Sequence, residues 1–236
     1  MRRSPFRDAA SSIVFMSRMI TLKARDGHEL DAYVAEPPQT MRGGLVVVQE
    51  IFGVTNHIMR VADQYAAQGY KVVAPAMFDR VERNYETGYE PDDIAAGRAV
   101  IGKLDWANTM KDVAATIEHA RPYGKIALVG YCWGGTIAWL ANARLSGLAC
   151  TVAYYGGSIP AFIGEAPKVP IMLHFGENDA SLPVEKAREV ATRYPKAQSY
   201  FYPAGHGFNC DHRGSYDAAA AALARTRTLE FLGKHL

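Results

Sequence analysis

The spacing of hydrophobic residues divides the chain into an alternating beginning and a longer, differently patterned remainder. Apolar and polar residues alternate from Met19 to Ala24 and again from His28 to Ala35. Such alternation is typical of strands with one buried face, and Asp26-Gly27 between the two segments favours a tight turn. Pro37-Pro38 then interrupts the pattern, since proline cannot continue a hydrogen-bonded strand. The chain is therefore predicted to open with a β-hairpin.

Beyond the hairpin, short runs that are apolar throughout alternate with longer segments of helical period. Fully apolar runs are typical of parallel strands covered on both faces, and the alternation of the two kinds predicts β-α-β units. Counting the hairpin, about eight strands are expected in an α/β fold, a mostly parallel sheet with helices on both faces and no large cap domain. Further strands are expected at 44–49, 70–75, 125–129, 148–155, 170–175 and 199–202. Helices are expected at 55–68, 92–104, 105–120, 136–145, 184–194 and 215–236.

Length and charge narrow the organisation and the partners. A chain of 236 residues without linker-like composition fits a single domain, predicted at 19–236, after a disordered N-terminal extension at 1–18. The formal net charge is +2 and no long basic run occurs, so a nucleic-acid partner is not expected. No apolar run approaches the length of a membrane span, so no membrane partner is expected either.

The cysteines bear on the compartment. There are three, Cys132, Cys150 and Cys210, which is too few and odd in number for a disulfide framework. At least one free thiol suits a reducing compartment, so a cytoplasmic protein is expected. Cys150 begins an apolar strand, where a core position is expected. The expected partner is a small molecule, and the expected state is a monomer or a weak homodimer.

A candidate nucleophile lies where the strand at 125–129 gives way to a helix. Gly130-Tyr131-Cys132-Trp133-Gly134 has the form Gly-x-Cys-x-Gly, the nucleophile elbow of α/β-hydrolases with cysteine in place of serine. Glycines on both sides allow a tight, strained turn that exposes the sulfur at the carboxyl edge of the sheet. The following helix amino terminus favours the thiolate over the thiol. Taken alone, the same glycines would also suit a helix packed on a strand beside a buried cysteine.

A base and its orienting carboxylate are expected at later strand ends. Asp179 follows Phe175-Gly176-Glu177-Asn178, and His206 lies between glycines just past the last expected strand. Each alone is also a common turn residue. Together with Cys132 they give the order nucleophile, acid, histidine, which is that of the α/β-hydrolases, and we predict a catalytic triad.

At these residues the sequence resembles the dienelactone hydrolase family. The motifs are Gly130-Tyr131-Cys132-Trp133-Gly134-Gly135, Ala204-Gly205-His206-Gly207-Phe208 and Gln49-Glu50-Ile51-Phe52-Gly53, within a likeness that spans 19–236. The resemblance implies an α/β-hydrolase fold. It also implies that Glu50 contacts the resting thiol and that substrate binding moves it, so that the thiolate forms and pairs with the histidine. An ordinary strand-end carboxylate is the alternative for Glu50.

The expected reaction is hydrolysis of carboxylic esters or lactones. Cys132 would attack the carbonyl to give a thioester acyl-enzyme, which water activated by His206 would cleave. Backbone N–H groups of Ile51 and Trp133 are expected to hold the tetrahedral oxygen. The competing class is non-catalytic, either a ligand-binding protein of this fold or a redox sensor that uses Cys132. Such proteins would not need Glu50, Asp179 and His206 together.

Substrate recognition is where the chain departs from the family. The resemblance implies two arginines that hold a substrate carboxylate, one after the strand ending at Pro75 and one four residues after the catalytic histidine. Arg80 matches the first, whereas Cys210 occupies the second position, and a thiol cannot replace a bidentate guanidinium. Arg83 and Arg213 lie near these positions without matching the motif. A broader ester hydrolase is therefore expected, with other activated esters such as phosphate esters among its substrates.

The rest of the pocket is expected to be aromatic. The segment at 76–91 has no periodicity and is predicted to be a loop over the carboxyl ends of the strands, where ligands bind in such folds. Core positions are the alternative for these rings. The candidate substrate-binding aromatics are Phe52, Phe78, Tyr85, Trp133 and Phe208.

No metal or cofactor is expected. His206, Cys210 and His212 are residue types that bind metals, but a second cluster is missing and the triad already uses His206. Gly53 does not begin a Gly-x-Gly-x-x-Gly motif, and the Gly-Lys of a phosphate-binding loop is absent.

Overall fold

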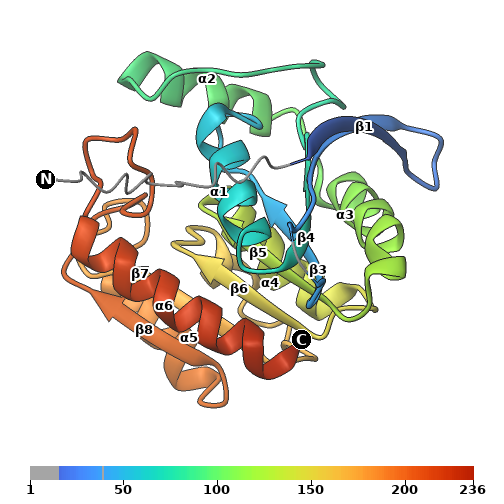
Figure 1. The fold of residues 1–236 in the computed structure, drawn as a ribbon. Helices are drawn as coiled ribbons and strands as arrows, with labels where there is room; N and C mark the ends of the chain where they lie inside the picture. The colour runs from blue at the N-terminus through green and yellow to red at the C-terminus, as the bar shows by residue number, and fades with distance from the viewer. Residues whose placement is uncertain (1–15, 39) are drawn as a thin grey trace, which may run out of the picture.

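The architecture rests on one eight-stranded sheet, seen in Figure 1. The structure is a computed structural model that describes residues 16–38 and 40–236. The strand order is β1-β2-β4-β3-β5-β6-β7-β8. The strands are β1 (Ser17–Lys23), β2 (Glu29–Ala35), β3 (Gly43–Val48), β4 (Tyr70–Pro75), β5 (Ile126–Tyr131), β6 (Cys150–Tyr154), β7 (Ile171–Gly176) and β8 (Gln198–Tyr202).

The two edges of the sheet differ in direction. β1 and β2 form the predicted antiparallel hairpin with Ser17 opposite Ala35, and β2 pairs antiparallel with β4. From β4 to β8 every pair of neighbours is parallel. The carboxyl ends of β3, β5, β6, β7 and β8 therefore meet at one edge of the sheet, where an α/β fold places its ligands.

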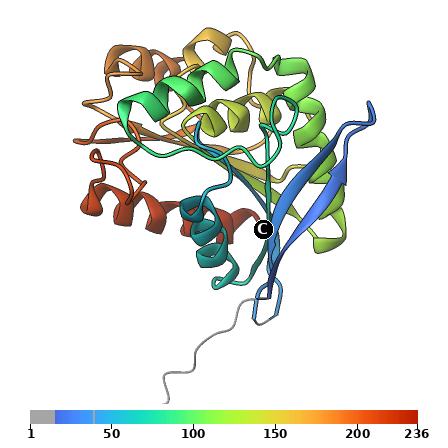
Figure 2. The same cartoon turned by 90° about the horizontal axis from the view of Figure 1, so that it is seen from above.

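Helices cover both faces of the sheet (Figure 2). α1 and α6 lie on one face, and α2, α3, α4 and α5 lie on the other. The fold class predicted from the sequence is thus confirmed. The helices are α1 (Asn56–Ala66), α2 (Pro91–Ile101), α3 (Trp106–Ala120), α4 (Trp133–Arg144), α5 (Val184–Arg193) and α6 (Ala218–His235).

Alternate residues of the central strands supply two separate cores. In β3, Val46 and Val48 pack with the core under α3, α4 and α5, whereas Leu45 and Val47 pack with the core under α1 and α6. All four side chains are fully buried. Successive strand residues point to opposite faces, so a strand covered on both faces is apolar at most of its positions. This explains the continuous apolar runs in the sequence.

The largest boundary difference concerns α4. It begins at Trp133, directly after the candidate nucleophile, whereas the sequence pattern predicted 136–145. Gly134 and Gly135 argue against a helix by propensity, but here they are needed for close packing described below. α6 begins at Ala218 rather than 215 because Asp217 caps it, its side chain accepting from the Ala220 N–H at 2.9 Å.

The N-terminal prediction is tested only at its end. Residues 1–15 of the expected extension at 1–18 lie outside the described residues, and β1 already begins at Ser17, two residues before the predicted start of the domain. Within 16–38 and 40–236, no helix has the length and apolar character needed to cross a membrane.

Candidate active site

The candidate nucleophile lies in a strained turn between β5 and α4. Cys132 has φ 56° and ψ −115°, a backbone conformation that non-glycine residues rarely adopt. The turn is fixed by the Cys132 N–H, which donates to the Tyr154 carbonyl of β6 at 3.0 Å. A Cβ on Gly130 would collide with the Gly134 backbone, and a Cβ on Gly134 would lie 2.5 Å from the Val48 carbonyl oxygen. Both glycines are therefore required for the elbow to close.

Three strand ends bring the predicted triad together. The Cys132 Sγ lies 3.0 Å from His206 Nε2, and His206 Nδ1 lies 2.7 Å from Asp179 Oδ2. The other oxygen of Asp179 accepts from the Ser181 and Leu182 N–H groups at 2.7 and 3.0 Å, which fixes the carboxylate. The histidine is thus oriented by a buried carboxylate and faces the sulfur with its other nitrogen. Hydrogen-bond distances of this kind are what a nucleophile and its base require.

The electrostatics favour a protonated His206. Burial by itself lowers the pKa of His206, but the Cys132 sulfur and the Asp179 carboxylate outweigh it and raise that pKa to about 10. An imidazolium is the counter-ion that a thiolate needs, and a thiolate is the nucleophilic form of cysteine. The Cys132 side chain remains partly exposed at the elbow. A carbonyl carbon can therefore approach it.

Two backbone amides, one after β3 and one after β5, have no partner in the described parts of the chain. Trp133 N–H is the first amide of α4, and Ile51 N–H lies in the turn after β3, and neither donates a hydrogen bond there. Free amides at a helix amino terminus point toward negative charge. The Trp133 amide is thus available to a negatively charged group.

Glu50 forms a buried ion pair beside the triad. Its side chain is 2% exposed, and its Oε1 lies 3.3 Å from Arg213 Nη1. The Arg213 guanidinium also lies over the Phe52 ring, 5.4 Å from the centroid. Burial lowers the pKa of Arg213, but Glu50 and Cys132 outweigh this effect and raise it. Negative charge at this end of the sheet therefore concentrates around one guanidinium.

The family follows from the sequence match to known proteins. A family profile described as "Dienelactone hydrolase family" matches residues 30–236. The chain belongs to the dienelactone hydrolase family. A Synechocystis relative assigned as a carboxymethylenebutenolidase is 36% identical over 217 residues, covering 83% of this chain and 88% of its own length. The carboxymethylenebutenolidase of Pseudomonas putida is 34% identical over 227 residues, covering 90% and 94%. This dienelactone hydrolase-like chain is accordingly a hydrolase.

Solved structures share the fold. A chain from Klebsiella pneumoniae assigned as a dienelactone hydrolase superposes with a TM-score of 0.82 at 26% identity, covering 94% of this chain and 99% of that one. A dienelactone hydrolase-like promiscuous phosphotriesterase from metagenomic libraries gives a TM-score of 0.77 at 21% identity, covering 93% and 98%. At 21% identity, the comparison with the phosphotriesterase shows a shared fold and no more.

One predicted substrate residue of this dienelactone hydrolase-family chain is occupied elsewhere. Arg80 donates to Asp112 of α3 at 2.7 and 2.6 Å and to Asp26 of the hairpin turn at 3.2 Å. Its guanidinium is thus already held by two carboxylates, and no contact joins it to the triad in the described residues. Arg213, which the family motif does not mark, supplies the guanidinium beside Glu50 instead.

The predicted aromatics fall into three groups. Phe78 contacts Trp133 and Tyr85, with ring centroids 5.4 and 5.6 Å apart. Phe52 lies under Arg213, whereas Phe208 is fully buried among the tyrosines beneath α6. Phe52 and Phe78 are nearly as buried as Phe208, and all three are core residues, which was the alternative for these rings. Tyr85 is only partly buried against the same core. The loop at 76–90 packs on the segment after β3, as expected, through the Thr87 N–H and the Phe52 carbonyl at 3.1 Å.

Tyr155 is a site residue that sequence reasoning missed. Its ring lies 5.2 Å from that of His206, and its φ is 37°, again unusual for a residue with a side chain. Its buried hydroxyl has no hydrogen-bond partner among the described residues. Burial and the nearby Glu50 raise the pKa of Tyr155 well above its usual value, so it remains a neutral donor. The available signal was its place at the end of β6, before Gly156-Gly157.

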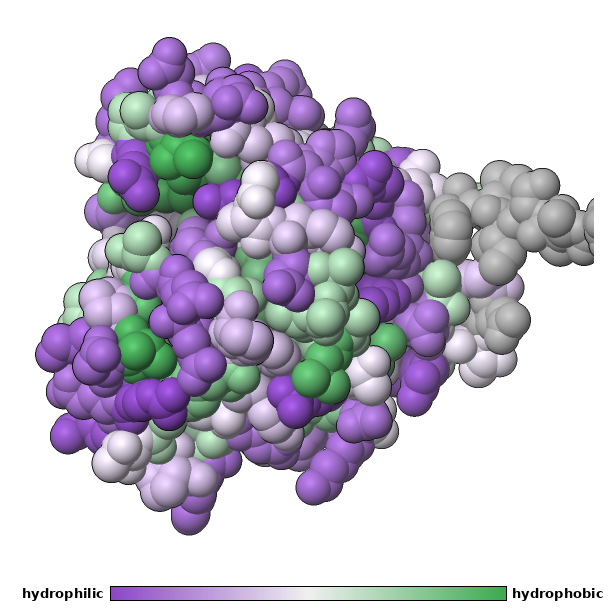
Figure 3. Space-filling view, turned by 90° about the vertical axis from the view of Figure 1, so that its left-hand side faces the viewer, coloured by the Kyte–Doolittle hydropathy of each residue, from purple (hydrophilic) through white to green (hydrophobic). Residues whose placement is uncertain are grey.

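The surface near this edge is mixed in character. Figure 3 views the molecule from the side toward which the arrowheads of β6 and β8 point in Figure 1, and shows hydrophobic residues in small separate patches among hydrophilic ones. No continuous apolar area is visible on this face in the described part. Such a surface suits access of a small molecule better than docking of a large apolar partner.

Proposed function

We propose that the protein hydrolyses carboxylic esters or lactones through Cys132. The thiolate attacks the carbonyl carbon, a C–S bond forms, and the carbonyl oxygen becomes negative against the Ile51 and Trp133 amides. The C–O bond then breaks, and His206 Nε2 gives its proton to the leaving alcohol. The product is a thioester acyl-enzyme. The 3.0 Å contact between Cys132 Sγ and His206 Nε2 carries this proposal.

Deacylation uses the same histidine in the opposite direction. Once the alcohol has left, His206 is neutral and can take a proton from a water molecule that attacks the thioester. The C–S bond breaks, the acid leaves, and the thiolate–imidazolium pair is restored. Asp179, bonded to His206 Nδ1 at 2.7 Å, keeps the ring in place in both steps.

Arg213 is our candidate for recognising an acidic group on the substrate. Its Nη1 lies 3.3 Å from Glu50 Oε1, and Cys210, at the sequence position of the family's second arginine, cannot bind a carboxylate as a guanidinium does. A substrate carboxylate would compete with Glu50 for Arg213. Because Arg80 is held by other carboxylates, Arg213 would be the single arginine that binds a substrate carboxylate. Neutral esters would therefore compete better with carboxylated ones.

Activated phosphate esters are included in the proposed range. A phosphoryl oxygen carries charge that the same two amides and guanidinium can stabilise. The structural neighbour described as a promiscuous phosphotriesterase is a precedent on this fold. We also propose a cytoplasmic location, because the three cysteines are free, which suits a reducing compartment.

A thiol redox sensor is the second candidate, and the other cysteines argue against it. Cys150 and Cys210 are fully buried, and burial raises the pKa of each thiol to about 12. A resolving cysteine must reach the oxidised sulfur as a thiolate, which both environments oppose. Turnover therefore fits this set of residues better than reversible oxidation.

Hydrolysis of a small ester panel tests the proposal. The panel holds p-nitrophenyl acetate and butyrate, a neutral lactone, a carboxylated dienelactone and a p-nitrophenyl phosphotriester. Wild type and Cys150→Ala should turn over esters at similar rates, whereas Cys132→Ala should lose activity by at least about 10³-fold. Equal activity of Cys132→Ala and wild type would contradict the proposal. The ratio of carboxylated to neutral rates, repeated with Arg213→Met, measures the contribution of that guanidinium.

A further inference from the structure

A second cluster of reactive side chains lies behind the triad, between the turn after β3, the start of α1 and the loop before α6. Glu50, His57 and Cys210 each offer one ligand atom, and these atoms lie within 4.8 Å of one another. All three residues are buried, with Glu50 1% and His57 4% exposed. Carboxylate oxygen, imidazole nitrogen and thiolate sulfur are the ligand types that Zn²⁺ prefers.

Two atoms of this cluster have no hydrogen-bond partner in the part of the chain that the structure describes. They are Glu50 Oε2 and His57 Nε2. Burying a polar atom without a partner is energetically unfavourable. Both of these atoms are hydrogen-bond acceptors, so one cation between them would satisfy both. Arg213 does not remove this need, because it contacts the other carboxylate oxygen, Oε1. A cation at Oε2 would therefore break no bond that Glu50 now makes.

The outer contacts of His57 prepare it as a ligand. His57 Nδ1 lies 3.0 Å from Asp211 Oδ1, and Arg60 holds the same carboxylate at 3.0 Å. A proton on Nδ1 is donated to Asp211, so the unshared electron pair stays on Nε2, the nitrogen without a partner. Metal-bound histidines commonly make this carboxylate contact with their second nitrogen.

We infer that Glu50, His57 and Cys210 form a binding site for a divalent transition-metal ion, with Zn²⁺ as the best match. The ion would bind Glu50 Oε2, His57 Nε2 and the Cys210 sulfur, which would release its proton to solvent. Solvent can supply a fourth ligand. From the sequence alone no metal was expected, and the residue types considered there, His206, Cys210 and His212, are a different set that the structure does not bring together among the described residues.

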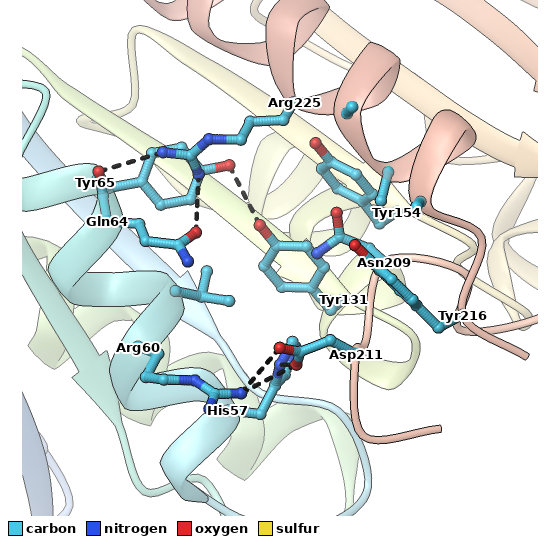
Figure 4. A pocket seen from close by; sticks show the side chains of 14 residues that line it. His57, Arg60, Gln64, Tyr65, Tyr131, Tyr154, Asn209, Asp211, Tyr216 and Arg225 are labelled. Atoms are coloured by element: carbon cyan, nitrogen blue, oxygen red, sulfur yellow. Dashed lines mark hydrogen bonds and ion pairs between the residues drawn. The ribbon is translucent and has the colours of Figure 1, made fainter. Parts of the chain in front are cut away.

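One proposed ligand, His57, borders a cavity. His57 and Asp211 line a cavity of about 350 Å³ between α1 and α6, together with Asn209 and Tyr216 (Figure 4). Figure 4 shows His57, Arg60 and Asp211 gathered at one end of this cavity. None of the three triad residues lines it. An ion could thus reach His57 without passing Cys132.

Cobalt titration of the Cys132→Ser protein tests the inference without interference from the nucleophile. Metal-free Cys132→Ser should bind one equivalent of Co²⁺ with the ultraviolet charge-transfer band of a cobalt–thiolate bond, and Zn²⁺ should displace it. Adding Cys210→Ser should remove the band, whereas adding Cys150→Ser should leave it. Adding Asp211→Asn should weaken binding by about 10- to 100-fold.

Folding of each variant is checked by near-ultraviolet circular dichroism, and a thermal measurement guards against a variant that misfolds. Zn²⁺ should raise the melting temperature of the Cys132→Ser protein, since an ion that binds only the folded state stabilises it. The inference is overturned if Cys132→Ser shows neither the band nor the thermal shift. It is also overturned if the band survives Cys210→Ser, or if His212→Asn removes binding while Cys210→Ser does not, which would place the ion on the exposed trio His57, Asp211 and His212.

Discussion

Replacing Asp179 by asparagine should move the alkaline limit of activity to lower pH. The change removes one charge and little else, because an asparagine Oδ1 can still accept from the Ser181 and Leu182 amides. What is lost is the carboxylate 2.7 Å from His206 Nδ1. The amide nitrogen that replaces it cannot accept the Nδ1 proton, so the imidazolium loses its main orienting partner.

The magnitude follows from the pKa of His206. Raising it from 6.5 to about 10 corresponds to about 5 kcal/mol of net stabilisation of the imidazolium. A hydrogen bond between charged groups contributes about 1.5–3 kcal/mol of this, which is about 1–2 pH units. The proton on His206 Nε2 is needed for the leaving group, so activity falls as the pH rises through this pKa. The limit should lie near pH 10 in wild type and near about pH 8–9 in Asp179→Asn.

The assay is kcat/KM for a simple alkyl ester, followed by acid release in a pH-stat between pH 6 and 11. At neutral pH, Asp179→Asn should also be slower by about 10²-fold or more. The folded pKa of His206 lies above its unfolded value, so its contribution to the free energy of unfolding is full below about pH 6.5 and is lost as the pH rises through about 10. The destabilisation by Asp179→Asn should shrink over the same window. Coincident alkaline limits in the two proteins would refute the reasoning.

Three further substitutions have expected results. Arg213→Met should lower the free energy of unfolding by about 3–5 kcal/mol, since it leaves the buried Glu50 charge unpaired. Adding Glu50→Gln should recover part of this loss. Strictly additive losses of the two substitutions in urea titrations would contradict the ion pair. Gly134→Ala places a Cβ 2.5 Å from two backbone carbonyl oxygens and should lower the free energy of unfolding by about 1–3 kcal/mol and remove most of the activity. Gly164→Ala, in open space, should be neutral. Equal melting temperatures of the two variants would count against the elbow packing. Arg80→Met should destabilise the protein yet leave KM for carboxylated esters within about twofold, and a tenfold rise in KM would instead make Arg80 a substrate residue.

The fold was predictable because its signal is local. A strand covered on both faces is apolar at most positions, so β3, β5, β6 and β7 stand out as short, largely apolar runs in the sequence. The start of α4 was predicted three residues late because Gly134 and Gly135 oppose helix by propensity. Their reason for being there is contact with β3 and β6, which propensity does not describe.

The triad residues were predictable from their types and their order at strand ends, and the structure brings them within hydrogen-bond distance. The arginines were not. Arg80 matches the family position but is paired with Asp112, a residue of α3 whose position relative to the loop depends on the tertiary fold. Arg213 lies outside the motif, and the conformation of the loop before α6 brings it to Glu50.

Trapping the acyl-enzyme tests the central claim most directly. Wild-type protein mixed with excess p-nitrophenyl butyrate and quenched in acid within the first turnovers should gain the mass of one butyryl group. Peptide mapping should place that group on Cys132 as a thioester that hydroxylamine removes at neutral pH. The Cys132→Ala protein should gain no such mass. A butyryl group on another residue, or rapid turnover in which no Cys132 adduct forms and Cys132→Ala remains active, would contradict nucleophilic catalysis by this cysteine.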